Sequence, residues 1–336
     1  MGSDQNPVPD VEGAVLAARE YGQTIILVGD EGQIKRELDR HGATGLPIEI
    51  VHAEQKVTMG DKPGEVGRAK PDSSMHIGMR LVKERQADAF VTAGNTGAVL
   101  SIATLHTLKR IPGVSRPALS TILTLQDKAM ILLDIGANAD CRPEWMAQFA
   151  VMGSIYAERA LSKSQPGVAL LSIGEEAGKG SSLVKEAAEL LASCGVNFIG
   201  NVEPKEILAG AADVVVMDGF TGNVLIKTME ALGNTLFSFL REEIKADWRS
   251  AIGGLLAKPA LKRVYRQVDP FEVGGAPLLG VDGVVIIGHG RSNAYAIKNA
   301  IRQAQLAALG QIVEAIRQGL AVTATHEDSL SESSQK

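Results

Sequence analysis

Cysteine is scarce in this sequence of 336 residues: only Cys141 and Cys194 are present, and they form no CxxC motif. Two isolated cysteines provide neither a disulfide framework nor a zinc site, which is typical of a protein in a reducing compartment. Long apolar runs are absent as well, so the sequence predicts no membrane-spanning helix. The start, MGSDQNPVPD, lacks the basic and apolar stretches of a signal peptide, and we therefore expect a cytoplasmic protein without a metal.

Aromatic residues make up 4% of the chain, whereas glycine is abundant at 36 residues. Many tight turns and few aromatics favour an α/β protein over an aromatic-rich β-sandwich. The net charge of -5 argues against nucleic acid as a partner, because backbone phosphates require a basic face. With 45% hydrophobic residues, the chain is able to bury a sizeable core.

Short apolar runs alternate with helix-like stretches, and many of them end in glycine or aspartate. This alternation predicts a largely parallel sheet covered by helices on both faces. In such sheets ligands bind beyond the carboxyl ends of the strands. The expected strands lie at 24–29, 48–52, 88–94, 129–136, 167–174, 196–201, 213–219 and 281–290.

The segment GEEAGKGSS follows one of these strands and precedes an amphipathic helix. It resembles a phosphate-binding P-loop but has one residue too few between its glycines, and Gly180 stands where Ser or Thr is required. Nucleotide triphosphate binding is therefore rejected. A flexible turn at a helix start, with Lys179 beside it, still suits an oxyanion or phosphate. The alternative is an ordinary exposed lysine.

Four further turns combine polar side chains with glycine: AGNTGA, DIGAN, DGFTGN and HGRSN. We expect them to open at one sheet edge, where amide and hydroxyl donors would face a phosphate or a developing oxyanion. The alternative is that Asn and Asp simply cap helices. The candidate substrate-binding residues are Asn95, Thr96, Gly97, Asp134, Asn138, Asp218, Thr221, Gly222, His289 and Ser292.

Neither covalent nor zinc catalysis has support, since the sequence contains no nucleophile elbow, no zinc-protease motif and no Cys/His pair with a family signature. Cys141 is more typical of a small apolar filler than of an acyl acceptor. The GxGxxG spacing is absent as well, so a nicotinamide cofactor is disfavoured.

Strand signals stop between Leu225 and Gln267, where the pattern predicts helices interrupted by Gly253, Gly254 and Pro259. This helical insertion, at about 228–268, carries apolar residues surrounded by basic ones. Three uses stay open: contact with an anionic membrane, contact with an acidic partner, or a dimer interface. The apolar members are Trp248, Ile252, Leu255, Leu256, Ala260, Leu261 and Val264, and the basic ones are Lys245, Arg249, Lys258, Lys262, Arg263 and Arg266.

Eight segments taken together resemble the bacterial acyl-[acyl-carrier-protein]:phosphate acyltransferases, the PlsX family. The resemblance covers nearly the whole chain in order. The segments are RAKPDSSM, TAGNTGAVL, IPGVSRPAL, LLDIGANADCRPE, QFAVMGSIYA, LLSIGEEAGKG, DVVVMDGFTGNVLIKT and GGAPLLGVDG.

The resemblance implies a three-layer α/β/α sandwich related to phosphotransacetylases and isocitrate dehydrogenases, forming one catalytic domain over 1–325. It implies a homodimer without a cofactor that converts acyl-carrier-protein thioester and inorganic phosphate to acyl phosphate for phospholipid synthesis. A membrane glycerol-3-phosphate acyltransferase would consume the product, and the protein would associate peripherally with the inner face of the membrane. By the same analogy, Lys179 and Asn223 are the expected catalytic residues.

Two alternatives remain: a phosphotransacetylase-like enzyme using acyl-CoA, and a non-catalytic regulator that binds acyl-carrier protein. The ends of the chain carry expectations of their own. Residues 326–336 are polar and predict a disordered tail. Family members begin with a strand that runs into a turn resembling Met1 to Asp4, so we expect a strand upstream of Met1.

Overall fold

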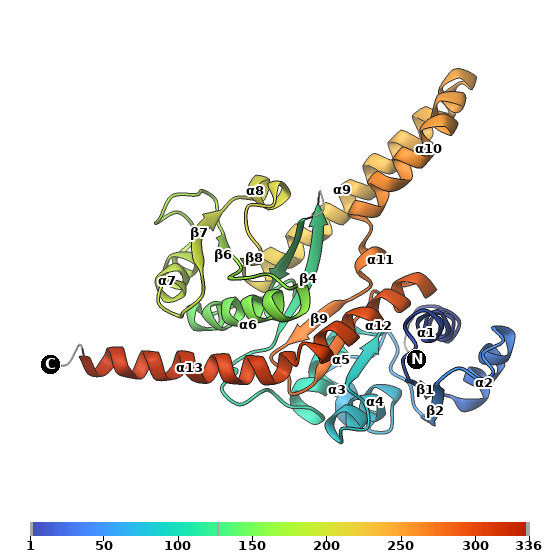
Figure 1. Ribbon diagram of the computed structural model, residues 1–336, viewed down its shortest axis with the longest axis horizontal. Coiled ribbons are helices and arrows are strands. Elements are labelled where there is room, and N and C mark those ends of the chain that lie inside the picture. Colours follow the sequence, from blue (N-terminus) through green and yellow to red (C-terminus); the bar gives the residue numbers. More distant parts are fainter. Residues whose placement is uncertain (1–2, 126–127, 334–336) are drawn as a thin grey trace.

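The computed structural model describes residues 3–125 and 128–333 of the chain (Figure 1). Its centre is an eight-stranded sheet in the order β3-β10-β9-β4-β5-β8-β6-β7. Strands β5, β8, β6 and β7 are parallel to one another, and β10 is parallel to β3. The bounds are β3 Ala89–Thr92, β10 Val284–Ile287, β9 Ala276–Leu279, β4 Ala118–Leu125, β5 Lys128–Leu133, β8 Val214–Val216, β6 Val168–Leu171 and β7 Phe198–Val202.

The strands expected from the sequence did not include β4 and β9. These two strands join the β3-β10 pair to the group of β5, β8, β6 and β7 through antiparallel pairing. β9, with the sequence APLL, is only four residues long. No glycine lies between Val114 and Leu125 to mark the start of β4. Because these two strands lie between the groups, β3 and β10 run opposite to β5, β8, β6 and β7.

Alternating side chains of β5 explain why helices cover both faces of the sheet. Ile131 and Leu133 join a core with helices α6, α7 and α13, whereas Met130 and Leu132 join a core with α8 and α9. Period-two alternation with both faces buried is typical of the centre of a three-layer fold. The helices have the bounds α6 Pro143–Leu161, α7 Ser182–Leu191, α8 Pro204–Ala209, α9 Gly219–Ala246 and α13 Ile312–Ser333.

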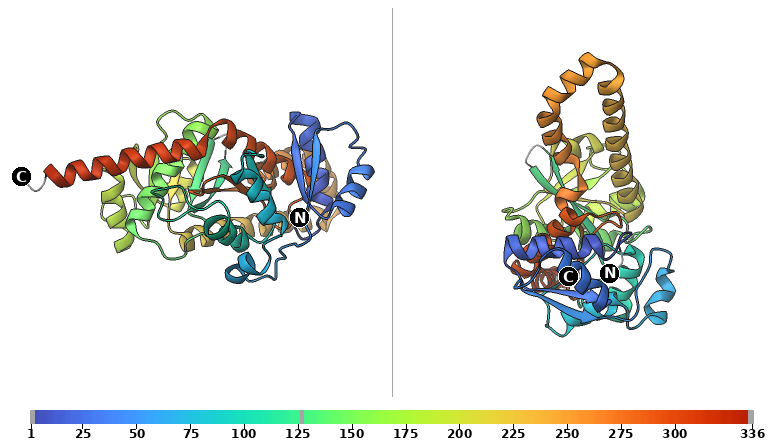
Figure 2. Two further views of the ribbon diagram at one scale, coloured as in Figure 1. Left: turned by 90° about the horizontal axis from the view of Figure 1, so that it is seen from below. Right: turned by 90° about the vertical axis from the view of Figure 1, so that its right-hand side faces the viewer.

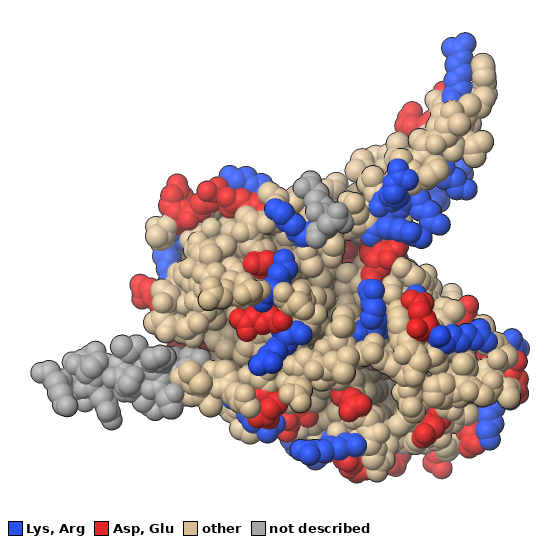
Figure 3. Space-filling view, viewed as in Figure 1, with Lys and Arg blue, Asp and Glu red and all other residues tan. Residues whose placement is uncertain are grey.

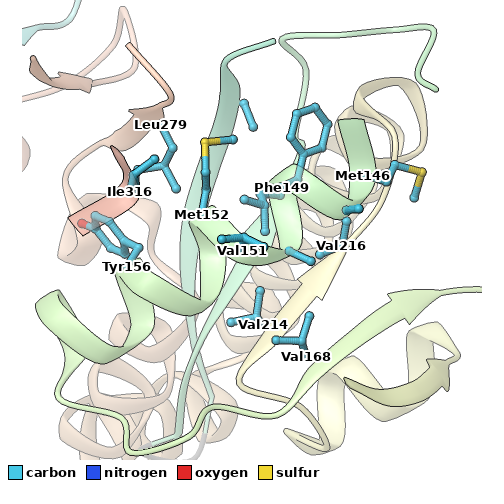
Figure 4. Packing of buried hydrophobic residues seen from close by; sticks show 14 of the residues in the cluster. Met146, Phe149, Val151, Met152, Tyr156, Val168, Val214, Val216, Leu279 and Ile316 are labelled. Atoms are coloured by element: carbon cyan, nitrogen blue, oxygen red, sulfur yellow. The ribbon is translucent and has the colours of Figure 1, made fainter. Parts of the chain in front are cut away.

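Helix α6 provides much of the first core (Figure 4). Met146, Phe149 and Met152 recur at helical spacing on its buried face, and Tyr156 continues the stripe toward Ile316 of α13. Full burial of side chains of this size is worth about 1.5–3 kcal/mol each. This packing fixes the position of the turn that precedes α6.

The remaining helices pack around β3, β10 and β9 or lie farther from the sheet. One core joins α3, α4 and α5 to Leu119, Leu278 and Val285, and α12 covers the opposite side of β10. These elements are α1 Val8–Tyr21, α2 Glu31–Arg40, α3 Pro63–Ala69, α4 Ser74–Lys83, α5 Thr96–Ser101, a π-helical turn Ile102–His106, α10 Trp248–Val268, α11 Pro270–Val273 and α12 Ala294–Leu309.

Strands β1 (Ile25–Gly29) and β2 (Ile48–His52) form a separate parallel pair. Between β1 and β3 lies a slot of about 610 Å³, lined by both strands and by side chains of α1, α4 and α12. Within the described ranges, β1 pairs only with β2 and β3 only with β10, so one edge of each strand faces the slot.

Helices α9 and α10 form a long antiparallel hairpin that projects from the body of the protein (Figures 1 and 2). The sequence predicted breaks at Gly253, Gly254 and Pro259, but α10 is continuous from Trp248 to Val268. Gly254 lies against Ile244 of α9, where a Cβ atom would collide with the isoleucine side chain. Here glycine serves close helix packing, and Pro259 lies exposed within the continuous helix.

The last helix, α13, leaves the body in the opposite direction (Figure 1). The sequence suggested a disordered tail over 326–336, whereas α13 extends to Ser333, and residues 334–336 lie outside the described part of the chain. In the described ranges, no helix is both long and apolar enough to cross a membrane.

Candidate functional site

The turn after β5 is organised by Asp134, whose side chain is completely buried. Its carboxylate accepts hydrogen bonds from the backbone N–H groups of Leu119, Gly136, Ala137 and Asn138 at 2.7–3.1 Å. The side-chain amide of Asn138 adds another at 2.8 Å. Burial raises the pKa of Asp134, and the surrounding donors oppose that rise. Asp134 therefore holds the turn in shape and leaves no free face for a ligand.

Helix α9 begins directly against this turn. Asp218 caps the helix by accepting from the N–H of Thr221 at 2.9 Å and from its hydroxyl at 2.6 Å. The N–H of Gly219 donates to the carbonyl of Asn138 at 2.8 Å. A Cβ atom at Gly222 would collide with the backbone carbonyl of Asp134, so only glycine permits this approach.

Asn223, one of the two expected catalytic residues, is exposed at the start of α9. Its side chain lies beside the backbone of Gly136, since a Cβ atom on that glycine would be 3.7 Å from its Oδ1. The structure thus brings Asn223, Gly136 and Asn138 together through the packing of two turns. The exposed Asn223 amide at this turn is suited to donate to an oxyanion or a phosphate oxygen.

Lys179 lies in the loop between β6 and α7, at the same end of the sheet. β6 is the neighbour of β8 in parallel register, so its carboxyl end is beside the start of α9. The Lys179 side chain is exposed, and in the described residues no hydrogen bond or ion pair joins it to Asn223. The loop is held by the Asn201 amide, which donates to the carbonyl of Glu176 at 3.2 Å.

Ser172 is a residue of this loop that the sequence analysis missed. Its side chain is buried, and its hydroxyl has no hydrogen-bond partner in the described residues. Gly180 lies close by, because a Cβ atom there would be 2.9 Å from the serine oxygen. The signal in the sequence was weak, since a serine between a strand and a glycine is common in turns.

A second group of turns forms around the carboxyl ends of β3 and β10. The amide of Asn95 donates to the carbonyls of Met59 at 3.2 Å and of Asp61 at 3.0 Å, and its oxygen caps α5. Thr96 and Gly97 follow in the first turn of α5.

The turn after β10 completes this second group. The N–H of Asp4 donates to the carbonyl of Gly290 at 3.0 Å. His289 is exposed and accepts from the N–H of Arg291 at 3.1 Å through its Nδ1. Ser292 is buried, and its hydroxyl has no partner within the described ranges. Met1 and Gly2, which the sequence analysis assigned to the same first turn as Asp4, lie outside the described residues.

The five polar turns follow strands of two opposite directions, and the expectation that all of them open at one sheet edge stays a prediction. The turns around Asp134, Lys179 and Asn223 follow strands of one direction, and those around Asn95 and His289 follow strands of the other. The antiparallel strands β4 and β9 cause the reversal. The capping interpretation is confirmed for Asp218 and for Asn95.

Cys141 is unsuited to act as a nucleophile. Burial raises the pKa of its thiol to about 11, and nearby carboxylates add to this. A thiol in that state is almost entirely protonated at neutral pH, whereas the thiolate is the reactive form. In the residues that the structure describes, no cluster of His, Cys, Asp and Glu could hold a metal ion.

The sequence of the whole chain was compared with those of known proteins. A family model described as "Fatty acid synthesis protein" matches residues 1–315. The phosphate acyltransferase of Dictyoglomus turgidum is 48% identical over 322 residues, which cover 95% of this chain and 96% of that protein. The phosphate acyltransferase of Alkaliphilus oremlandii is 46% identical over 320 residues, covering 95% of each.

The chain belongs to the phosphate acyltransferase family. It is accordingly an acyltransferase enzyme of fatty-acid and lipid synthesis. The resemblance drawn from the eight sequence segments is confirmed by this membership.

Solved structures confirm the fold class. A phosphotransacetylase from Streptococcus pyogenes superimposes with a TM-score of 0.59 at 18% identity, covering 91% of this chain and 93% of that one. The EutD phosphotransacetylase from Staphylococcus aureus gives a TM-score of 0.57, also at 18% identity, covering 89% and 92%. At this level of identity the likeness concerns the fold alone.

Proposed function

We propose that the phosphate acyltransferase of this chain forms acyl phosphate reversibly from acyl-[acyl-carrier-protein] and inorganic phosphate. The observation that carries the proposal is the packing of α9 on the Asp134 turn, which leaves Asn223 exposed beside Gly136. Family membership gives the class of reaction, and the polar character of the described turns fits a transfer to phosphate.

In the proposed reaction, a phosphate oxygen attacks the thioester carbonyl and forms the new C–O bond. The tetrahedral oxyanion then collapses, the C–S bond breaks, and the carrier thiol leaves with the electron pair. A thiol has a pKa of about 8.5, so it departs with little help from an acid. Burial raises the pKa of the Cys141 thiol to about 11, so Cys141 receives no role as an acyl acceptor in this scheme.

Lys179 and Asn223 receive separate roles. Lys179 neutralises the charge of the phosphate, while the amide of Asn223 donates to the oxyanion or orients the nucleophile. Donors of this kind act mainly in the transition state, where the charge develops. The second group of turns, with Asn95, His289 and Ser292, contributes to the binding of the phosphate and of the phosphopantetheine arm that carries the thioester.

The hairpin supplies the features from which a homodimer and a peripheral membrane location are proposed. Lysine and arginine side chains gather over α9 and α10 (Figure 3). Large apolar side chains are exposed along the same helices. Near the turn between the helices we assign Trp248, Leu255 and Leu256 to the inner face of an anionic membrane. Nearer the body we assign Leu232 and Phe239 to a second copy of the chain.

The proposed location of the protein is therefore the cytoplasm, beside the membrane. The proposed reaction uses no cofactor. Its product would pass to a membrane glycerol-3-phosphate acyltransferase on the way to phosphatidic acid. Acyl phosphate is a reactive mixed anhydride, so a consumer at the same membrane surface would shorten its exposure to water.

The deciding experiment measures release of free thiol from acyl-carrier protein, with and without inorganic phosphate. We expect release only with phosphate, together with formation of acyl phosphate that hydroxylamine traps. Matched reactions with acyl-CoA test the phosphotransacetylase-like alternative. Faster turnover of acyl-CoA would overturn the assigned donor, and absence of turnover with both donors would leave a binding protein.

A further inference from the structure

A basic cleft lies beside the candidate site, on the loop between the π-helical turn and β4. Its volume is about 830 Å³. Four of its lining residues are basic and none is acidic, although the whole chain carries a net charge of -5. The basic residues are Lys109, Arg110, Arg116 and Arg142.

These four cations lack carboxylate partners: every ion pair between described residues involves other side chains. Arg116 and Arg142 instead lie over the ring of Trp145, at 4.9 and 5.6 Å from its centroid. Arg110 donates to the carbonyl of Ser115, which fixes the curve of the loop. All four cations are exposed, so their charge is available to a partner.

Apolar side chains accompany the charges. Leu105 is 62% exposed at one side of the cleft, and Pro112 is exposed as well. Arginine and tryptophan with exposed apolar neighbours are the residue types enriched in protein–protein interfaces. A site for a single phosphate would instead concentrate buried donors on one point.

The cleft is connected to the Asp134 turn by short contacts. The amide of Asn138 donates to the carbonyl of Pro117, next to Arg116, at 2.8 Å. On the other side, the Cys141 thiol contacts the carbonyl of Asn138 at 3.5 Å, and Arg142 follows directly. Gln148 of α6 braces the loop by accepting from Ser115 at 2.8 Å and donating to Gly113 at 3.0 Å.

We infer that this cleft docks the acidic surface of the acyl-carrier protein. The inference rests on the proposed function, because it names the surface that receives the proposed donor. Four exposed cations complement an acidic protein surface and speed encounter, while Leu105 and Trp145 provide apolar anchors. A carrier bound there would direct its thioester arm past Asn138 toward Asn223.

The test compares the double variant Arg110→Glu/Arg116→Glu with the wild-type protein. Charge reversal should raise KM for acyl-carrier protein about tenfold or more at low salt, because interface charges chiefly control association. kcat should change little, and turnover of an acyl-pantetheine thioester, which lacks the protein, should stay unchanged. The wild-type KM should also rise with salt, and that salt dependence should weaken in the variant.

Arg36→Glu/Lys83→Glu is the matched control, since it reverses two exposed charges elsewhere on the protein. An unchanged KM in the cleft variant would overturn the docking site while the proposed function stands. An equal loss of turnover with acyl-pantetheine would show that the cations bind the small substrate. Dissociation of the variant into monomers in sedimentation would show that they contact a second copy of the chain. If wild-type protein releases no thiol from acyl-carrier protein, the proposed function itself fails.

Discussion

At the scale of single residues, charge and exposure distinguish the groups that act on a ligand from those that shape the site. Asp134 reads in the sequence like a ligand-binding carboxylate, yet it is buried and bonded to the N–H groups of its own turn. Sequence pattern identifies a polar turn but not the direction of each side chain. That direction depends on packing against α9, far away in the sequence.

Lys179→Ala and Asn223→Ala test the assigned roles. Each change should lower kcat on the order of a hundredfold, the usual cost of removing one transition-state donor. Both side chains are exposed, so the melting temperature should stay close to that of the wild type. Steady-state kinetics and thermal unfolding measure the two effects.

Lys185→Ala is the control for Lys179, because Lys185 is exposed on the adjoining helix α7. It should retain wild-type turnover. A Lys179 or Asn223 variant with near-normal kcat would exclude that residue from the mechanism.

At the scale of elements, the eight strands expected from apolar runs are present, because continuous buried strands leave a clear pattern in the sequence. β4 and β9 escaped prediction, and with them the reversal of direction inside the sheet. The helical character of the α9–α10 segment was predicted from the loss of strand signals, but its arrangement as a two-helix hairpin was not. The continuity of α10 through Pro259 was not predicted either, because packing between α9 and α10 outweighs local helix propensity.

Gly222→Ala tests the contact between α9 and the Asp134 turn. The added methyl group would collide with the Asp134 carbonyl, so α9 must shift. We expect a loss of about 1–3 kcal/mol in the free energy of unfolding. Turnover should fall as well, since Asn223 moves with the helix. Chemical denaturation measures the first effect and kinetics the second.

Gly233→Ala is the matched control in the same helix, because a Cβ atom there meets open space. It should stabilise the protein by about 0.5–1 kcal/mol, as alanine does in place of a mid-helix glycine. Equal stability of both variants would contradict the proposed close approach.

Leu255→Glu/Leu256→Glu tests the membrane assignment of the hairpin. These side chains are 68% and 78% exposed, and charge on them opposes insertion between anionic lipids. The variant should fail to sediment with anionic vesicles while it stays dimeric in analytical ultracentrifugation. Ile199→Glu/Leu208→Glu, which alters exposed apolar residues outside the hairpin, should still bind vesicles. Dissociation of the hairpin variant into monomers would assign this segment to the dimer interface.

At the scale of the whole molecule, the described strands form two separate sheets, the β1-β2 pair and the eight-stranded sheet. The slot of about 610 Å³ between β1 and β3 is bordered by one edge of each strand and has apolar walls such as Val11, Met75 and Ile297. One added strand could pair with β1 and β3 at once and cover the apolar walls between them.

We therefore expect that an extended segment rich in valine and isoleucine, joined ahead of Ser3, enters the slot. Parallel pairing on both sides would merge the two sheets. The melting temperature should rise, and the amides of β1 and β3 should exchange more slowly with deuterium, because the added strand would pair with both strands and exclude water from the slot. The control is a glycine–serine segment of equal length, which adds chain without apolar side chains to bury. If the two extensions give the same melting temperature and the same exchange rates, the slot does not accept a strand.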